Sequence, residues 1–190
     1  QINERGRLLR APVEALLEQA QEVEAVLSGK TDSSSLKVGG TLTIGNYLAV
    51  SIIAKMKQQN QNIDISLTVA NTSQITAKVL NFELDIGLIE GEIQHPDLEV
   101  IEWCDDQLVV FCAPSHPLAK VGTLTDKHLK QTPWILREAG SGTRQTFDRA
   151  MHGLLPSITV AHELQHTEAI KRAVEANLGI GCLSQVTLED

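Results

Sequence analysis

The fold is decided by residues 36–88, which read LKVGGTLTIGNYLAVSIIAKMKQQNQNIDISLTVANTSQITAKVLNFELDIGL. Apolar residues alternate with other residues in three stretches, 36–44, 63–69 and 84–88, and we expect the first strand to end at Gly45. Apolar residues recur at helical spacing in the two intervening stretches, 48–56 and 75–80. This β-α-β-α-β order predicts parallel strands joined by right-handed crossovers.

A second set of the same elements follows further along the chain. An apolar run over 108–112 ends at a break with two prolines, 113–117, where we place a boundary between lobes. Beyond it the patterns predict strands over 134–136, 158–160 and 180–183, and helices over 141–152 and 167–177. The sequence therefore predicts an α/β protein with lobe I over 36–112 and lobe II over 113–190.

The first thirty residues follow a different pattern. From Leu9 to Leu27 apolar residues recur at steps of 4, 3, 4, 3 and 4, with acidic and amide side chains between them. Such a seam predicts a coiled-coil dimerisation helix over 1–30, and an ordinary amphipathic helix on a core is the alternative. Pro12 is expected to kink or restart this helix.

Composition excludes several classes of function. The 190 residues carry 16 Lys and Arg against 24 Asp and Glu, a formal net charge of −8, so this chain alone does not suit the nucleic-acid backbone. There is no run of 18 apolar residues, which argues against a membrane span. Cys104, Cys112 and Cys182 lack CxxC spacing and are expected to be buried small apolar residues in a reducing cytoplasm.

Four turns between a strand and a helix are rich in glycine and polar side chains. Their candidate binding residues are Thr43, Gly45, Asn46, Asn71, Thr72, Ser73, Ser141, Gly142, Thr143, Gln165 and His166. Backbone N–H groups at a helix start attract anions, and ligands of open α/β sheets bind beyond the carboxyl ends of the strands. We therefore expect a small anion between the lobes. A plain helix cap, with Ser141 capping, is the alternative for any single turn.

Residues 162–166 read HELQH, which matches the H-E-x-x-H signature of zinc proteases. That motif needs a helix to place both imidazoles on one face, whereas here a strand leads into it. The sequence offers no later histidine as a third ligand. We expect no metal at His162 and His166, no cofactor and no catalytic residues, so that the protein is not an enzyme.

Several motifs in order resemble the LysR-type transcriptional regulators over almost the whole chain. They are GRLL at 6–9, LTIGNYL at 42–48, LDIGLI at 84–89, APSHPLA at 113–119, REAGSGTR at 137–144 and EAIKRAV at 168–174 with GIG at 179–181. The resemblance implies a linker helix followed by two Rossmann-like lobes of periplasmic-binding-protein type II architecture. It also implies the effector-binding domain of a cytoplasmic DNA-binding regulator, which passes the signal of its ligand through an oligomer.

Two departures from the family accompany this resemblance. The N-terminal helix-turn-helix is absent, so DNA and RNA polymerase are expected as partners only of the intact protein, which is a homodimer or homotetramer. Family members continue beyond Asp190, so the C-terminal part of lobe II is expected to be missing here. Within the family, the motifs are most similar to members that sense small inorganic anions, including sulfur oxyanions such as sulfite.

A solute-binding protein of a transporter remains the main alternative, because it shares the fold. It requires a secretory signal and has no use for a dimerisation helix. A metalloprotease is the less favoured alternative.

Overall fold

The computed structural model describes residues 9, 12, 13, 16, 17, 19–21, 23, 24, 27 and 35–189. The remainder of the predicted dimerisation helix over 1–30 lies outside the described residues. Those described before residue 28 are helical, and the apolar seam residues Leu9, Val13, Leu16, Val23 and Leu27 are all exposed. No described helix is long and apolar enough to cross a membrane.

The chain divides into two compact units. The first contains residues up to Ile89 together with His95–Glu99, and the second contains Glu90–Gln94 together with the residues from Val100 onward. We refer to them as the first and second lobes. This division differs from the predicted boundary between residues 112 and 113, because the strand at Leu108–Phe111 pairs within the second sheet.

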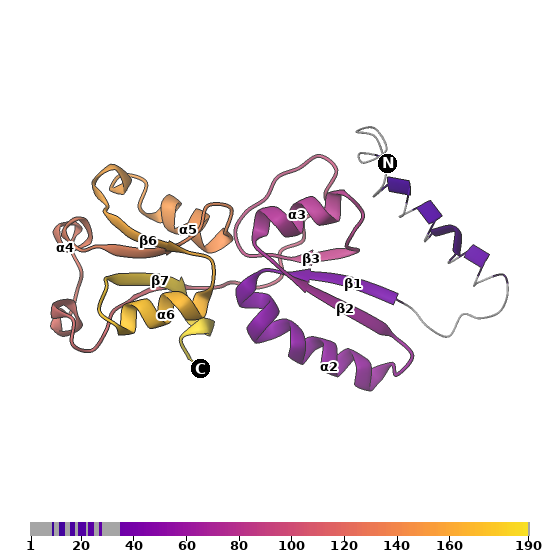
Figure 1. The fold of residues 1–190 in the computed structure, drawn as a ribbon, viewed down its shortest axis with the longest axis horizontal. Helices are drawn as coiled ribbons and strands as arrows, with labels where there is room; N and C mark the ends of the chain where they lie inside the picture. Colours follow the sequence, from indigo (N-terminus) through magenta and orange to yellow (C-terminus); the bar gives the residue numbers. More distant parts are fainter. Residues whose placement is uncertain are drawn as a thin grey trace, which may run out of the picture. The chain divides into compact units, whose positions relative to one another are not determined.

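The first lobe is a three-stranded parallel sheet with a helix on each face (Figure 1). Its elements are β1 (Ser35–Gly40), η1 (Ile44–Ala49), α2 (Val50–Gln59), β2 (Asp64–Val69), α3 (Thr72–Leu80) and β3 (Ile86–Leu88). The strand order is β2-β1-β3, and Val38 of β1 lies opposite Leu67 of β2 and Ile86 of β3. The predicted β-α-β-α-β order and its parallel strands are confirmed.

The first strand is shorter than the sequence pattern predicts. The alternation continues to Ile44, but pairing with β2 ends where Gly40 meets Val69, and the chain is helical from Leu42. The Gly45 N–H donates to Thr41 O at 2.6 Å, which is an α-type bond, and the π-helix η1 runs directly into α2. The alternation of apolar residues along one strand carries no information about where its partner strand ends.

The second lobe is a four-stranded mixed sheet with α5 and α6 on opposite faces (Figure 1). Its elements are β4 (Leu108–Phe111), η2 (Pro117–Lys120), α4 (Asp126–Gln131), β5 (Trp134–Arg137), α5 (Gly142–Ala150), η3 (Leu155–Ser157), β6 (Val160–Leu164), α6 (Thr167–Glu175), β7 (Ile180–Ser184) and η4 (Gln185–Thr187). The order is β4-β7-β5-β6, and β4 alone runs antiparallel to its neighbour.

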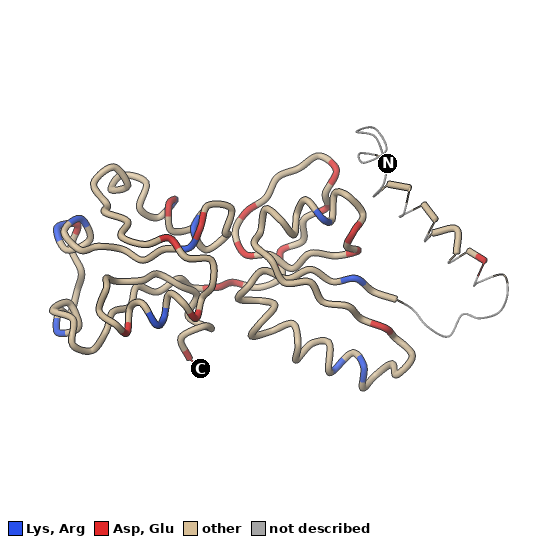
Figure 2. The backbone as a smooth tube through the Cα atoms, viewed as in Figure 1, with Lys and Arg blue, Asp and Glu red and all other residues tan. Residues whose placement is uncertain are grey.

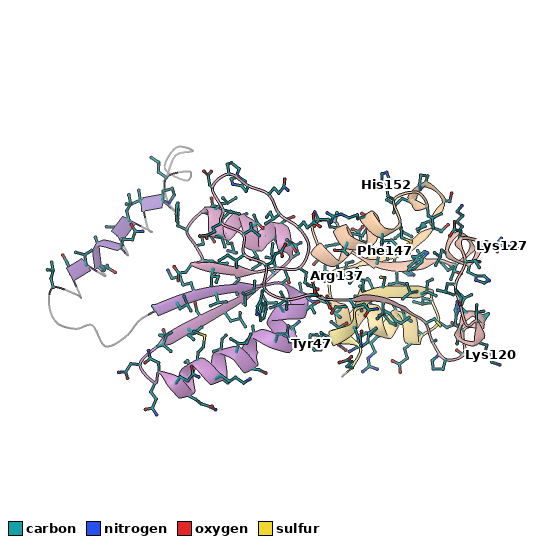
Figure 3. All side chains as sticks on the ribbon, turned by 180° about the vertical axis from the view of Figure 1, so that it is seen from behind. Tyr47, Lys120, Lys127, Arg137, Phe147 and His152 are labelled. Carbon is teal, nitrogen blue, oxygen red and sulfur yellow. The ribbon has the colours of Figure 1, made fainter. Side chains whose placement is uncertain are left out.

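Two apolar clusters hold the second sheet between its helices. Trp134 and Phe147 lie on one face with ring centroids 4.9 Å apart, and Ile135 packs with Ile170 and Val174 on the other. Figure 3 shows Lys127 and His152 pointing outward from the same lobe. Because β5 contributes to both clusters, its carboxyl end is fixed relative to both helices.

The cysteines lie in three different environments. Cys182 is buried, and desolvation raises its pKa to about 12, in line with a small apolar core residue. Cys112 is half-buried. The prediction of burial is wrong for Cys104, which is exposed, because the segment that contains it, residues 98–107, forms no helix or strand that would pack it against the core.

Candidate functional site

The first-lobe half of the predicted site lies at the carboxyl ends of β1 and β2. Gly45 packs against Val69 so closely that an added Cβ would lie 2.7 Å from its Cγ2, which brings the two turns together. Thr43 is buried in the helical turn before η1, whereas Asn46 is exposed. These turns therefore share one edge of the sheet, although Thr43 and Asn46 lie in a helix and not at a strand end.

The second of these turns is closed by its own side chains. The Asn71 side chain accepts a hydrogen bond from Gln74 N at 3.0 Å, and Gln74 Oε1 accepts one from Asn71 N at 3.3 Å. This reciprocal capping box satisfies two donors at the start of α3. Thr72, which follows it, is buried, and Ser73 is exposed.

The second-lobe half of the predicted site lies beyond β5 and β6, which are parallel neighbours. Their carboxyl ends therefore meet at one edge, where α5 and α6 begin. Ser141, Gly142 and Thr143 are all buried, whereas the side chains of Gln165 and His166 are exposed. The structure brings the two predicted turns of this lobe together, but only one of them contributes buried predicted residues.

The turn before α5 is held in a defined shape. Ser141 N–H donates to Glu138 O at 3.2 Å, and Gly140 adopts φ +89, a left-handed conformation that favours glycine. The helix begins with Gln145 N–H donating to Ser141 O at 3.0 Å. Ser141 makes no side-chain cap hydrogen bond, so the plain-cap interpretation does not describe this helix start.

Two threonine hydroxyls at these helix starts have no partner. Among the described residues, Thr143 Oγ1 and Thr167 Oγ1 are buried and make no hydrogen bond. Thr143 is 3% exposed and Thr167 2%. An unsatisfied buried hydroxyl costs about 1–3 kcal/mol, so both positions are ones where an added hydrogen-bond acceptor would be favourable.

Sequence reasoning does not single out Thr167 as a binding residue. The pattern places it only at the start of a helix, and no local signal distinguishes a buried threonine at that position from an exposed one. Its burial follows from the sheet: α6 lies against β5 and β7 through Ile170 and Val174, and Thr167 is one turn before Ile170 on the same side.

The charged residues around the α5 turn are already paired. Arg137, which is 2% exposed, donates to Glu138 through Nε at 2.9 Å and Nη2 at 3.1 Å. Arg144 donates to Asp148 Oδ1 at 2.9 Å, to Glu163 Oε2 at 3.0 Å and to Arg137 O at 3.0 Å. Burial opposes the charge on Arg144, but the hydrogen bonds and charges of Asp148 and Glu163 outweigh it and raise its pKa.

The H-E-x-x-H residues do not form a helical pair. The predicted strand over 158–160 is displaced, because β6 begins at Val160 and runs through the motif to Leu164. His162 and Glu163 lie on β6 and point to opposite faces of the sheet, while His166 precedes α6. Glu163 is engaged by Arg144. Within residues 35–189 and the described part of the N-terminal helix, no three His, Cys, Asp or Glu side chains are grouped to hold a metal ion.

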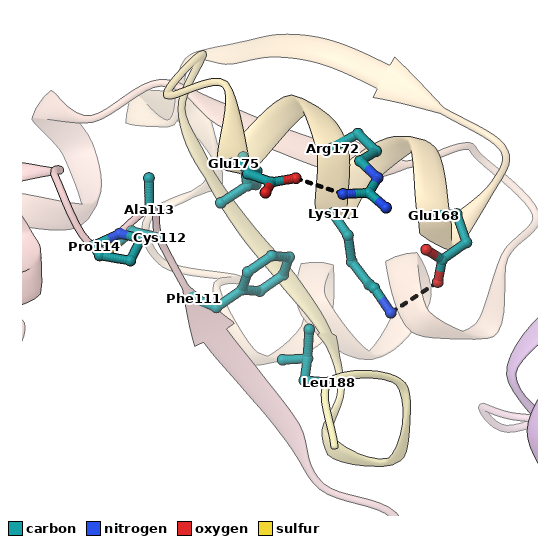
Figure 4. A pocket seen from close by; sticks show the side chains of 10 residues that line it. Phe111, Cys112, Ala113, Pro114, Glu168, Lys171, Arg172, Glu175 and Leu188 are labelled. Carbon is teal, nitrogen blue, oxygen red and sulfur yellow. Dashed lines mark hydrogen bonds and ion pairs between the residues drawn. The ribbon is translucent and has the colours of Figure 1, made fainter. Parts of the chain in front are cut away.

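A separate pocket of about 390 Å³ lies on the α6 side of the second lobe (Figure 4). Phe111, Pro114 and Leu188 form its apolar wall, and none of the predicted site residues lines it. Its two cations are occupied, because Lys171 pairs with Glu168 at 2.8 Å and Arg172 with Glu175 at 2.8 Å. Figure 4 shows both pairs along the helix.

Charge is mixed over both lobes. Figure 2 shows basic and acidic residues interspersed along the described chain, with no continuous basic stripe on the part that is drawn. This distribution agrees with the net charge of −8.

Comparison with known proteins gives a consistent answer. The family model described as the LysR substrate binding domain matches residues 29–190. The HTH-type transcriptional regulator YeiE of Escherichia coli is 42% identical over 189 residues, which are 100% of this chain and 64% of that protein. The HTH-type transcriptional activator CmpR of Synechocystis sp. is 32% identical over 176 residues, 93% of this chain and 57% of that protein.

A solved structure shows the same architecture. The regulatory domain of Synechocystis CcmR, in complex with 2-PG, superposes with a TM-score of 0.74 at 32% identity, over 81% of this chain and 74% of that one. The chain spans less than two thirds of the length of the curated relatives described above. With its two α/β lobes and a family match over 29–190, this chain belongs to the family of LysR substrate-binding domains, which have the periplasmic-binding-protein-like fold.

Proposed function

We propose that this chain is the ligand-sensing part of a LysR-type transcriptional regulator and that its effector is a small anion held at the starts of α5 and α6. One observation carries this proposal: Thr143 Oγ1 and Thr167 Oγ1 are buried without a partner at two neighbouring helix starts. Helix N-termini favour negative charge, and hydroxyls there can donate to an oxyanion.

The paired state of the arginines narrows the class of ligand. The charges of Arg137 and Arg144 are already offset by carboxylates, so we expect a ligand to rely mainly on neutral hydroxyls and backbone N–H groups beside the helix starts. Neutral donors suit a compact oxyanion, which accepts several hydrogen bonds at once. A sulfur oxyanion such as sulfite fits this description. The related CcmR domain binds 2-PG, which supports a small ligand in this fold.

The first-lobe residues Thr43, Asn46, Thr72 and Ser73 stay a prediction, as do Gln165 and His166 of the second lobe.

We also propose that this chain catalyses no reaction and acts in the cytoplasm. DNA and RNA polymerase are partners of the intact protein only. Support comes from relatives that are named HTH-type transcriptional regulators and extend well beyond the region matched here.

We propose that the N-terminal helix joins two copies of the chain. The described seam residues Leu9, Val13, Leu16, Val23 and Leu27 are exposed and recur at heptad spacing. Leu16→Glu places a charge in this seam and is expected to convert the dimer to monomer in light scattering without changing anion affinity. A wild-type chain that is monomeric at concentrations of tens of micromolar, where modest interfaces are populated, would contradict this.

Calorimetric titration tests the anion site. The chain is titrated with sulfate, sulfite and phosphate at an ionic strength held constant with chloride, so that general screening does not change. Thr143→Val removes one hydroxyl and is expected to lose about 1–3 kcal/mol of binding free energy. Its free energy of unfolding should stay the same or rise, because the lost hydroxyl had no partner.

Thr187→Val is the matched control. Thr187 is equally buried, but its Oγ1 donates to Ser184 O at 2.7 Å. This variant should lose about 0.5–1.5 kcal/mol of stability and keep its anion affinity. If Thr143→Val binds the anions as the wild type does, or if no anion binds the wild type, the proposed site is wrong.

A further inference from the structure

The segment Glu90–Gln94 belongs to the second lobe, although first-lobe residues flank it on both sides. Just upstream, Leu88 is held in the first lobe, because its carbonyl accepts a hydrogen bond from Thr41 N at 3.0 Å. We call residues 90–94 the crossover segment. The chain therefore passes from the first lobe to contacts with the second within a few residues of Leu88.

Gln145 and Arg149 of α5 hold the crossover segment at Glu92. Gln145 Oε1 accepts from Glu92 N at 3.1 Å, and Gln145 Nε2 donates to Glu92 O at 3.2 Å. The Arg149 guanidinium pairs with the Glu92 carboxylate, which lowers the pKa of Glu92 and raises that of Arg149. Gln145 and Arg149 are four residues apart and therefore share one face of the helix.

Gly91 brings the same segment against the first turn of α5. Its φ is +88, and an added Cβ would lie 2.6 Å from Gln145 Oε1 and 3.0 Å from Gly142 Cα. Gly142 belongs to the proposed anion site. The crossover segment therefore touches the helix turn on which the proposed ligand would act, and a side chain at position 91 would strain the backbone and crowd Gln145 and Gly142.

We propose that Gln145 and Arg149 are positioning residues that couple the first turn of α5 to the crossover segment. The proposal rests on the proposed function, in that the signal to be transmitted is an anion at the α5 start. Coupling of this kind is reciprocal: a ligand that orders the α5 turn orders residues 91–92, and disturbing residues 91–92 loosens the turn. Both side chains act through the helix and the segment and do not contact the ligand.

The first arm of the test needs no ligand. Amide hydrogen exchange is followed by NMR at Glu92, whose N–H donates to Gln145 Oε1, and at Gln145, whose N–H donates to Ser141 O. Gly91→Ala should raise the exchange rate about tenfold at both amides, since a left-handed non-glycine residue costs about that factor. Gly153→Ala, where an added Cβ meets nothing within 4 Å, should change neither.

If Gly91→Ala does not fold, Gln145→Ala takes its place and is expected to speed exchange at the Glu92 amide and at the amide of residue 145. An increase at Glu92 with no increase at residue 145 in the variant overturns the coupling.

The second arm adds sulfate at constant ionic strength. In the wild type the amide resonances of Thr143 and Glu92 should shift along one binding curve. In Gln145→Ala/Arg149→Ala the Thr143 resonance should still shift, whereas that of Glu92 should not. A Glu92 shift that survives in this double variant overturns the coupling. A Thr143 resonance that never responds overturns the proposed function instead, and the ligand-free arm then decides the coupling by itself.

Discussion

The start of α3 in the first lobe and the start of α5 in the second lobe each follow a parallel strand but differ in how they satisfy their polar groups. Asn71 and Gln74 close the α3 start with a reciprocal capping box. At the α5 start Ser141 makes no cap hydrogen bond, and Thr143 Oγ1 is buried without a partner. The α6 start repeats the second pattern, with no side-chain cap at His166 and an unpaired Thr167 Oγ1.

This difference is the basis on which we propose a ligand at the α5 and α6 starts and none at the α3 start. A capped helix start has used its donors internally and gains little from an added anion. An uncapped start with a buried unpaired hydroxyl carries a cost of about 1–3 kcal/mol that a bound acceptor removes. Both lobes place helices after parallel strands, but the turns between strand and helix differ in their chemistry.

The largest effect is expected from placing an acidic side chain at the start of α5. Ser141→Asp places a carboxylate where we propose the anion binds. It is expected to remove measurable sulfate binding while leaving the thermal midpoint unchanged or higher, because a helix start stabilises negative charge. Thermal unfolding with and without sulfate measures both the sulfate binding and the thermal midpoint. If the α5 start is instead an ordinary buried turn, the added carboxylate will lower the midpoint sharply, since Ser141 is 3% exposed.

An intermediate effect is expected from removing the side-chain cap at the start of α3. Asn71→Ala removes the cap of α3 and should cost about 0.5–2 kcal/mol of stability in denaturant unfolding, with sulfate affinity unchanged. Ser141→Ala is the matched variant, and because Ser141 makes no cap hydrogen bond its stability loss should be smaller. Equal losses in the two variants would remove the distinction between the turns.

The smallest effect is expected on the outer side of α5. Arg149 lowers the pKa of Glu92, so this pair stabilises the fold above the ordinary pKa of Glu92, 4.5, and loses that contribution as the pH falls through its lowered value. Arg149→Gln should therefore lower the thermal midpoint slightly at pH 7 and have less effect at pH 3. Both side chains are largely exposed, so a large shift at pH 7 would assign them a role that surface ion pairs rarely have.

Much of the architecture could be predicted from local patterns. Alternation and helical spacing placed β2, β5, α5 and α6, and Asn71 could be identified as a helix cap from its type and position. The helix α4 could not, because Asp126–Gln131 contains a single apolar residue, Leu129, and no periodic stripe. Its Leu129 is fixed instead by Trp134, whose Nε1–H donates to Leu129 O at 2.9 Å.

The features that local patterns could not predict depend on contacts between residues far apart in the sequence. The pairing of β4 with β7 joins residues about seventy positions apart, and no local signal assigns β4 to the second lobe. The turns of the candidate site could be predicted because polar residues follow strands there. Which hydroxyls end up buried without a partner depends on packing against the sheet, so Thr167 could not be distinguished in advance and exposed Gln165 and His166 could not be separated from it.

We propose that the starts of α5 and α6 lack side-chain caps because an anion completes them. Crystals of the chain grown with selenate, an anomalously scattering analogue of sulfate, test this most directly. We predict an anomalous peak within hydrogen-bond distance of Thr143 Oγ1 or Thr167 Oγ1, lost in Thr143→Val/Thr167→Val, and no peak at the start of α3. A peak at the α3 start, or an empty α5 and α6 edge in crystals that hold selenate elsewhere, would contradict the account.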